Sequence, residues 1–492
     1  MKYYLSLFLL WIGFTPLYSQ VPDPLPFGKT ITMDELRAHL YKITSEEMEG
    51  REVGTEGARL AADYIASQFN ISGLQPAAGQ PAAGNVDSLW FQKVPLVTAL
   101  VTRATVSGNG WEFSHQKEII CTGGNTQKKM KVPLIFAGEG LEDDYKNLDV
   151  KGKAVLIRGD SEEAMERKRL AAQHGAVAFL AVISTDEPSF LRMRKYLSFY
   201  LSRPRMAIFT EDHDLPAFAI SPAQAARMMR MDSRQWMQIR PGQVSEISVF
   251  AETETQPLTA ANVVGMVEGT DKKEEVLVIT AHYDHLGKKG GKIYPGADDN
   301  GSGVVALLEV AEAFALAAAK GFPPRRTILF MALTAEEKGL FGSEYYSTYP
   351  IFPLSQTVVN LNMDMVGHLD QNHTENARFV TVVGSDWLSS ELHEIHERAN
   401  REYVQLELDY SFNSPSHPEM FYYRSDQYNF AKYGIPVIFY TSADHEDYHK
   451  ASDTVDKIKF DRIEGVAQLL FYTAWEIANR ENRLKVDRTP PK

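Results

Sequence analysis

Histidine and acidic residues gather in two short stretches of this chain, A-H-Y-D-H-L-G and G-A-D-D-N-G-S-G. The first places His282 and Asp284 at the end of an apolar run, and the second places Asp298 and Asp299 just before a long helical pattern. Neither packing nor helix formation requires these residue types in this order. Imidazole and carboxylate groups are ligands of Zn²⁺ and, less often, of Mn²⁺ or Co²⁺. The two stretches therefore indicate a metal site.

Three more stretches place similar groups after apolar runs. Glu336 and Glu337 end one run, Asp364 lies near the end of the next, and His449 follows a third within D-H-E-D-Y-H-K-A-S-D-T. A carboxylate that bridges two cations can hold them about 3.5–4 Å apart, as in hydrolases that use two metals. The stretches together predict a metal centre that acts in hydrolysis.

The spacing of these residues suggests their roles. In a strand, the side chains of residues i and i+2 point the same way. Asp284 can thus accept a hydrogen bond from one imidazole nitrogen of His282 while the other nitrogen binds metal. Adjacent Glu336 and Glu337 on a turn point apart, so one can bind metal while the other faces the bound water.

The elements that must position these residues alternate between strand and helix. From residue 261 on, nearly all-apolar strand patterns are typical of a sheet buried on both faces. Strands that alternate with helices predict an α/β layered fold with a mostly parallel sheet, in which ligands bind at the carboxyl ends of the strands. The predicted strands are 263–268, 275–283, 327–334, 357–366, 379–383 and 436–441, and the predicted helices are 303–320, 339–348, 389–402, 425–433 and 460–480.

The earlier part of the chain shows two different patterns. Helices are predicted at Met33–Ile43, with Thr32 as N-cap, and at residues 58–70. Residues 95–259 instead show short β-like runs around one helix. Within them, basic residues lie among aromatic ones between 186 and 214, which is typical of a solvated loop, and a flap near the active site is the alternative.

In their order along the chain, the motifs A-H-Y-D-H, G-A-D-D-N-G-S-G, T-A-E-E-K-G-L-F-G-S, N-M-D-M-V-G and D-Y-H-K-A-S-D-T resemble the M28 family of di-zinc metallopeptidases. Each motif alone is weak, but all five occur in order, each near a predicted strand end. The likeness covers residues 260–480 and a segment at 45–75. The resemblance implies an α/β three-layer sandwich with a mostly parallel, mixed central sheet, as in zinc exopeptidases.

A second resemblance concerns the β-rich region. The pattern G-K-A-V-L-I-R-G-D, a helix and G-A-V-A-F-L-A-V-I is similar to the protease-associated domain, a small module inserted into several peptidase families. It implies that residues 95–259 form such an insert. The M28-like domain would then consist of residues 21–94 and 260–492, after a signal peptide at 1–20.

The M28 resemblance also implies a role for each motif residue. Two zinc ions per chain are expected, with Asp299 as the bridging ligand. Asp284 would orient His282, and Glu336 would be the general base for a metal-bridging water. A cis peptide bond after Asp299 is implied as well, which is rare where no proline follows. The implied ligands are His282, Asp299 and Asp364 for one ion, and Asp299, Glu337 and His449 for the other.

Several neighbouring residues have simpler explanations. Asp298 can serve as a helix N-cap, and Asp453 can cap or brace the last helix. Gln427 stands where many relatives have histidine, so no role is assigned to it. Five other histidines are not expected to bind metal, because the implied set is complete without them: His285, His368, His373, His417 and His445.

Composition and the first residues narrow the class of protein. The net charge of −13 argues against a nucleic-acid partner, since phosphate binding requires a basic face. The single cysteine, Cys121, excludes an intrachain disulfide and argues against a cysteine-ligated metal. Residues 1–20 have the positive start, apolar core and turn-prone end of a secretory signal, with a buried helix as the alternative. No later run of about 18 apolar residues predicts a membrane span. An exported, periplasmic or extracellular protein is expected.

The expected function is that of a zinc exopeptidase that hydrolyses N-terminal peptide bonds, an aminopeptidase with peptide substrates. The alternatives are a carboxypeptidase or dipeptidase of the glutamate carboxypeptidase branch, a glutaminyl cyclase with one zinc, and a non-catalytic module like transferrin receptor. A carboxypeptidase needs arginine to hold a carboxylate, and Arg424 is a candidate. Tyr440 and Tyr448 are candidates for a donor to the oxyanion. No motif indicates the side-chain preference or the oligomeric state.

Overall fold

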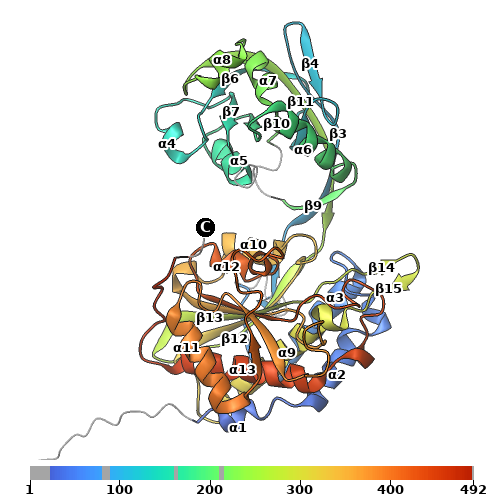
Figure 1. Cartoon of the computed structure of the whole chain (residues 1–492), viewed down its shortest axis with the longest axis vertical. Helices are drawn as coiled ribbons and strands as arrows, with labels where there is room; N and C mark the ends of the chain where they lie inside the picture. Colours follow the sequence, from blue (N-terminus) through green and yellow to red (C-terminus); the bar gives the residue numbers. More distant parts are fainter. Residues whose placement is uncertain (1–22, 80–88, 160–163, 210–214, 490–492) are drawn as a thin grey trace, which may run out of the picture.

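Two β-sheets organise the part of the chain that the computed structural model describes, residues 23–79, 89–159, 164–209 and 215–489. Figure 1 shows them in two lobes, joined by strands that run from one lobe into the other. The predicted signal peptide lies outside the described residues. All of the predicted metal ligands lie in the lower lobe of Figure 1.

The sheet of the lower lobe is mixed, with a parallel centre. Its strands in spatial order are β1 (Gln75–Pro76), β12 (Ala261–Val267), β16 (Arg326–Leu333), β13 (Lys272–His282), β17 (Thr357–Met363), β20 (Val437–Thr441), β18 (Phe379–Val383) and β19 (Glu407–Asp409), with β2 (Phe91–Lys93) beside β12. Strands β16, β13, β17 and β20 are parallel to one another. Strands β12 and β18 are antiparallel to their neighbours β16 and β20. The predicted mixed, mostly parallel sheet is thus confirmed.

Helices cover both faces of this sheet. Successive side chains of a strand point to opposite faces, so Leu277 and Ile279 of β13 pack into one core and Val276 and Val278 into the other. The first core is covered by α2 (Met33–Ile43), α3 (Glu56–Ile71), α9 (Gly303–Ala319), α11 (Ser390–Ala399) and α13 (Phe460–Asn479). The second is covered by α10 (Phe341–Thr348) and α12 (Tyr428–Ala431). The result is the predicted three-layer sandwich.

The upper lobe is built on a second sheet. Its strands in spatial order are β4 (Trp111–Ser114), β3 (Leu96–Gly108), β11 (Val244–Leu258), β6 (Met130–Phe136), β7 (Ala154–Arg158), β8 (Ala178–Val182), β10 (Ala217–Ile220) and β5 (Ile120–Gly123), with β9 (Arg205–Ile208) beside β3. Its helices are α4 (Glu142–Tyr145), α5 (Ala164–Gln173), α6 (Glu187–Tyr200), α7 (Pro222–Met228) and α8 (Ser233–Met237). Two apolar clusters of its own lie on the faces of this sheet. They support our proposal that residues 95–259 are an inserted domain.

The two lobes meet at a small apolar cluster. Strands β3 and β11 pair from Leu96 and Leu258 outward, so the chain leaves and re-enters the lower lobe at neighbouring positions. Beside this exit, Leu96 packs with Ala335 of the lower lobe, and Met206 and Ile208 of β9 pack against the same cluster. Strand β9 therefore lies close to the segment that carries Glu336.

The prediction of a solvated loop at 186–214 is wrong for its described part. Residues 187–200 form α6, whose first turn is capped by Asp186 accepting a hydrogen bond from the Ser189 amide at 2.7 Å, and β9 follows. The pattern was missed because α6 has no continuous apolar face: within it, Phe190 is the one buried residue. Residues 210–214 lie outside the described part of the chain.

One helical segment among the described residues, Ala297–Ala319, is long and apolar enough to cross a membrane, with a mean hydropathy of 1.7. It contains α9, and 78 % of its most apolar window is buried inside the lower lobe. Length and composition of this kind are also those of a core helix, and α9 packs against both the sheet and its neighbour α13.

Candidate metal centre

The carboxyl ends of the parallel strands bring the predicted ligands to one rim of the lower sheet. His282 is the last residue of β13, Asp364 directly follows β17, and Glu336 lies three residues after β16. His449 comes from the loop after β20, and Asp299 from the turn that precedes α9. This is the edge at which α/β sheets bind ligands, because each strand there releases its chain into a loop.

The first group of donor atoms surrounds the imidazole of His282. Its Nε2 lies 3.2 Å from Asp364 Oδ1, 3.5 Å from Asp299 Oδ1 and 3.7 Å from Glu336 Oε2. His282, Glu336 and Asp364 each offer a ligand atom within 4.8 Å of the others. The three residues can therefore converge on one cation.

A second group lies on the other side of Asp299. His449 Nε2 is 3.1 Å from Asp299 Oδ2 and 3.2 Å from Glu337 Oε2. His285, which was not expected to bind metal, lies with Nδ1 2.7 Å from Glu337 Oε1. The two oxygens of Asp299 thus face different imidazoles, Oδ1 toward His282 and Oδ2 toward His449. A carboxylate between two groups in this way has the placement that a bridging ligand needs.

The chemistry of the donor set fits divalent cations. Several carboxylates are buried side by side here, and such groups are costly to bury unless positive charge compensates them. Burial raises the pKa of Glu336 well above its usual value, and the nearby carboxylate of Asp364 raises it further, against the attraction of His282. Burial likewise raises the pKa of Asp284 to about 7. Two groups could each hold an ion: His282, Glu336 and Asp364 form one, and His285, Asp299 and Glu337 form the other. His449 lies beside the second group. The predicted ligand set of His282, Asp299, Glu337, Asp364 and His449 therefore stays a prediction, with His285 as an additional candidate.

Asp284 acts on His282 differently from the prediction. The imidazole Nδ1 lies 3.1 Å from the backbone carbonyl oxygen of Asp284, whereas the carboxylate Oδ1 is 3.9 Å away. The carboxylate instead accepts a hydrogen bond from the Glu336 amide at 3.0 Å. Asp284 therefore connects the His282 strand end to the segment of the predicted base.

The predictions for Asp298 and Asp453 are also corrected. Asp298 does not cap α9, because its Oδ1 accepts a 2.6 Å hydrogen bond from the Gly367 amide and its Oδ2 lies 3.2 Å from His445 Nε2. Asp453 braces the turn before α9 rather than the last helix: its carboxylate accepts hydrogen bonds from the amides of Asp298 and Asp299. The implied cis peptide bond between Asp299 and Asn300 is present.

A third group of possible ligands, His368, His445 and Asp447, does not fit a metal. The two imidazole rings stack with centroids 3.9 Å apart and planes 8° from parallel. An ion bound along both nitrogen lone pairs would have to lie in both ring planes, which stacked rings do not allow. Lys457 also pairs with the Asp447 carboxylate. The group forms an ion-pair network with Asp298, which places it behind the metal centre.

Arg51 is a residue of the 45–75 segment whose importance for the site the sequence analysis missed. Its side chain is fully buried. The guanidinium donates hydrogen bonds to the carbonyl oxygens of Tyr283 at 2.7 Å, Pro295 at 2.6 Å and Gly296 at 2.9 Å. Two loops that carry predicted ligands are thus held by one side chain of the N-terminal segment.

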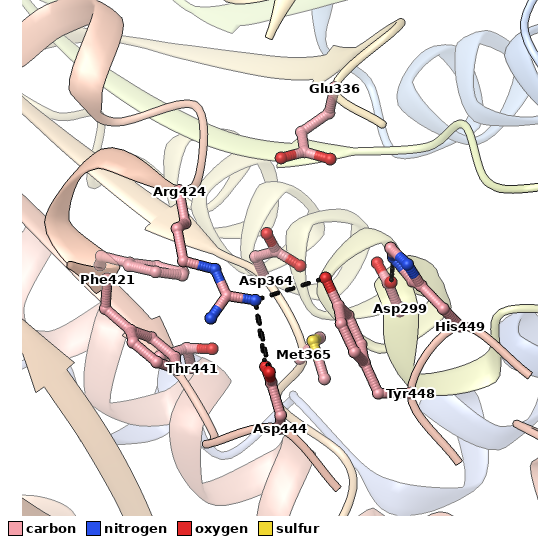
Figure 2. A pocket seen from close by; sticks show the side chains of 11 residues that line it. Asp299, Glu336, Asp364, Met365, Phe421, Arg424, Thr441, Asp444, Tyr448 and His449 are labelled. Atoms are coloured by element: carbon pink, nitrogen blue, oxygen red, sulfur yellow. Dashed lines mark hydrogen bonds and ion pairs between the residues drawn. The ribbon is translucent and has the colours of Figure 1, made fainter. Parts of the chain in front are cut away.

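The open side of the centre is a small pocket. Its lining includes Met365, Phe421 and Phe439 besides the metal-site carboxylates. Figure 2 shows the carboxylate of Glu336 on one side of this pocket and Tyr448 on the opposite side. Tyr440, the other candidate donor, points elsewhere, with its hydroxyl 3.2 Å from His396 Nδ1 in the core.

Arg424 lines the same pocket but is already paired. Its Nη2 lies 3.2 Å from Asp444 Oδ1 and 3.5 Å from the Tyr448 hydroxyl (Figure 2). Its Nη1 lies 3.6 Å from Glu419 Oε2. Next to it along the chain, the Ser425 hydroxyl donates a 2.7 Å hydrogen bond to Asp364. Gln427 accepts a hydrogen bond from Asn362, so it supports the base of the site without lining the pocket.

Comparison with known proteins identifies the lower lobe. Residues 262–474 match the model of peptidase family M28. These residues belong to that family. All five predicted ligands and Glu336 lie inside the matched range, so the M28 domain contains the whole candidate metal centre.

The similarity of this chain to known proteins extends beyond the M28 domain. Aminopeptidase YwaD of Bacillus subtilis is 26 % identical over 368 residues, which are 73 % of this chain and 70 % of that protein. The probable lipoprotein aminopeptidase LpqL of Mycobacterium tuberculosis is 26 % identical over 68 % of this chain, but the match spans only 59 % of that relative's length. Among solved structures, the zinc aminopeptidase BSAP of Bacillus subtilis is 21 % identical, with a TM-score of 0.46 over 94 % of this chain and 98 % of that one.

Proposed function

We propose that this chain is an exported zinc aminopeptidase that hydrolyses N-terminal peptide bonds with two metal ions. One observation carries the proposal: the two oxygens of Asp299 face two separate groups of imidazole and carboxylate donors beside a pocket that Glu336 lines. The names of the relatives, aminopeptidases and a zinc aminopeptidase, support the activity and the metal. The signal-like residues 1–20 support export to the periplasm or beyond the cell.

The proposed chemistry assigns separate tasks to the two sides of the pocket. Bound zinc ions would lower the pKa of a coordinated water and polarise the scissile carbonyl. The carboxylate of Glu336 takes a proton from the attacking water and delivers it to the leaving amine. The hydroxyl of Tyr448, across the pocket, donates a hydrogen bond to the oxyanion that develops on the substrate. Met365, Phe421 and Phe439 form the apolar wall that receives a substrate side chain.

The pairing of Arg424 favours an aminopeptidase over a carboxypeptidase. A carboxypeptidase needs a cation that is free to hold the terminal carboxylate of its substrate. The guanidinium of Arg424 is neutralised by Asp444 and Glu419, so a carboxylate would have to displace them.

Replacing Glu336 by glutamine tests the mechanism. Glu336→Gln should bind zinc as the unchanged chain does, because all five proposed ligands remain, yet lower kcat on aminoacyl reporter substrates by about 10²–10⁴. The matched control is Glu274→Gln on the exposed start of β13, with unchanged kcat. Turnover of Glu336→Gln near that of the control would contradict the role of Glu336.

Substrates and metal content distinguish the alternatives. The proposal predicts cleavage of peptides with a free N-terminus and no cleavage of N-blocked peptides with a free C-terminus, whereas the opposite result would indicate a carboxypeptidase. Two zinc ions per chain by metal analysis are expected, and a single ion with cyclisation of N-terminal glutamine would indicate a glutaminyl cyclase. A chain that binds no zinc and cleaves neither peptide would be a non-catalytic module.

A further inference from the structure

Helix α6 packs against the upper lobe with one side and leaves the other side exposed. Of its 14 residues, Phe190 is the one that is buried. The large apolar side chains that follow are exposed: Tyr196 by 66 % and Phe199 by 74 % of their surface, with Leu191 and Tyr200 each exposed by more than 40 %. Folding of this chain does not explain these aromatic residues, because exposing them to water forgoes the stabilisation that burial would provide.

Basic residues lie among the exposed apolar ones. Successive helical residues are separated by about 100°, which places six exposed side chains on one half of the helix. We call this half the α6 face, and it consists of Leu191, Arg192, Lys195, Tyr196, Phe199 and Tyr200. Arg205 adds a cation beside it, with its guanidinium 3.1 Å from the centre of the Tyr200 ring.

The charge of this face is opposite to that of the protein. The whole chain carries −13, whereas α6 contains three cations and a single acidic residue, Glu187, in its first turn. A cationic patch on an acidic protein marks the side that an anionic partner can approach. The partner is therefore negatively charged and also offers an apolar environment for aromatic rings.

The shape of the α6 face favours a broad surface over a peptide as its binding partner. Peptides are recognised in grooves or at sheet edges, where a partner surrounds them on several sides. The α6 face is the outer side of a single helix, and Figure 1 shows α6 on the opposite side of the upper lobe from α4. A convex helix that carries rings and cations together matches the interface of a bilayer, where rings enter the headgroup layer and basic heads reach phosphates.

We propose that the α6 face docks this protein on a bilayer that contains anionic lipids. Phe199 and Tyr196 enter the interfacial layer, and the stack of Tyr196 on Tyr200, with ring centroids 6.0 Å apart, holds the rings in place before binding. Arg192 and Lys195 pair with lipid phosphates. The inference does not depend on the proposed peptidase activity, since every residue it uses lies in the upper lobe.

Vesicle sedimentation tests the cationic part of the proposal. The chain from residue 21 on, the form that the predicted cleavage leaves, should bind vesicles of equal parts phosphatidylglycerol and phosphatidylcholine and not vesicles of phosphatidylcholine alone. Each cation near an anionic surface strengthens binding by a factor of roughly five. Arg192→Glu with Lys195→Glu changes the charge by four units and should weaken binding several hundredfold.

A matched charge reversal shows whether position or net charge matters. Lys131 on β6 and Lys146 after α4 are exposed lysines of the same lobe, away from the α6 face. Lys131→Glu with Lys146→Glu makes the same change in net charge and should weaken binding less than tenfold. Equal weakening by both pairs, or equal binding to both vesicle types, would overturn the proposal.

The aromatic part needs a separate pair of variants. Phe199→Ser with Tyr196→Ser should weaken vesicle binding at least tenfold and leave hydrolysis of soluble substrates unchanged, because both side chains are exposed. Tyr41→Ser with Tyr433→Ser, two exposed tyrosines of the lower lobe, is the control and should bind as the unchanged chain does. Sedimentation velocity without lipid adds a decisive outcome: a dimer that dissociates in the Phe199 and Tyr196 variant would show that a second copy, not a bilayer, covers this face.

Discussion

The two lobes of this chain have similar sheets but bury different kinds of polar side chain. Each has a mixed sheet with four parallel strands and apolar clusters on both faces. The lower lobe buries aspartate, glutamate, histidine and arginine at the carboxyl ends of its parallel strands. In the described part of the upper lobe, the buried polar side chains are neutral: Ser107, Ser221, Gln224 and Thr253.

This difference shows what distinguishes a catalytic sheet from a structural one. Among its described residues, the upper lobe has the same kind of strand ends but no buried carboxylate that needs compensation by a cation. In the lower lobe, several carboxylates share one buried rim, an arrangement that is stable only with opposite charge nearby. Dependence on metal should therefore be a property of one lobe and not of the whole chain.

Removal of metal should give the largest difference in behaviour between the two lobes. A chelator should abolish peptidase activity and lower the stability of the lower lobe by about 3–4 kcal/mol for each of the two ions, relative to the chain with zinc at 100–1,000 times its dissociation constant. Hydrogen exchange followed by mass spectrometry should then show faster exchange around His282, Glu336 and His449. Peptides from β6, β7 and β8 should exchange as before, and faster exchange there would contradict the separation.

Replacement of Arg51 should have the next largest effect on the stability of the lower lobe. Arg51→Met should cost the lower lobe about 3–5 kcal/mol, because it leaves three or more buried carbonyl groups without their donor. Arg51→Lys keeps the charge but not the geometry of the guanidinium, so we expect zinc to bind more weakly in it while the chain still folds. Urea denaturation and competition with a zinc chelator measure the two effects.

The control for Arg51 is an arginine of the same segment. Arg59 is half exposed and pairs with Glu56 and Asp63 on the surface of α3. Arg59→Met should change the stability by less than about 1 kcal/mol and leave the affinity for zinc as it is. Equal effects at the two positions would mean that Arg51 has only a general role in folding.

Acid should destabilise the lower lobe partly through His396. This imidazole is buried beside the Tyr440 hydroxyl, and burial, with the nearby His393, lowers its pKa to about 3. Below pH 6.5 the unfolded chain binds a proton that the folded chain does not, so stability falls as the pH drops from about 6.5 to about 3. His396→Gln should remove up to about 1.4 kcal/mol per pH unit of this slope, as measured by urea denaturation at several pH values.

The upper lobe allows the same test on a smaller scale. Burial lowers the pKa of His115 to about 4, so its window extends only from about pH 6.5 to about 4. His115→Gln should therefore flatten the acid limb of stability less than His396→Gln does. The reverse order would indicate that the upper lobe, not the lower, limits stability in acid.

Cys121 should give the smallest effect. Its thiol is fully buried in the upper lobe, and burial raises its pKa to about 12, so almost no thiolate forms at pH 8. A maleimide should label the folded chain at least about 100-fold more slowly than the chain unfolded in urea, without loss of activity. Labelling at the rate of a free thiol would show that this lobe opens readily.

The sequence was sufficient for the parts of the site that repeat a local pattern. Apolar strands that end in His or acidic residues predict both the sheet and its rim, because the position of a strand end is encoded next to it. The contacts of Asp284 and Asp298 were predicted wrongly. Either carboxylate could accept a hydrogen bond from a residue nearby in the sequence or from a residue far away in the sequence, and local patterns do not distinguish the two cases. The carboxylate of Asp298 accepts from Gly367, and no local pattern indicates that contact.

Helix α6 and Arg51 were missed or undervalued for a related physical reason. A sequence pattern predicts a helix through the apolar face that it buries, and α6 buries a single residue. Arg51 donates hydrogen bonds to backbone carbonyl groups, which every residue has. The types of the residues that it contacts therefore do not indicate the contact. Both features become visible only where burial and distance are known.

The pairing of β3 with β11 has a consequence for how such a chain can be assembled. Leu96 and Leu258 pair with each other where the upper lobe begins and ends. The upper lobe is therefore connected to the lower lobe in the way that the tip of a hairpin is connected to its two strands. A long excursion whose ends are already side by side adds little loop-closure entropy and leaves the register of the remaining strands unchanged. A lobe attached in this way can be enlarged, exchanged or reduced to a tight turn over time, while the rim of the lower sheet keeps its geometry.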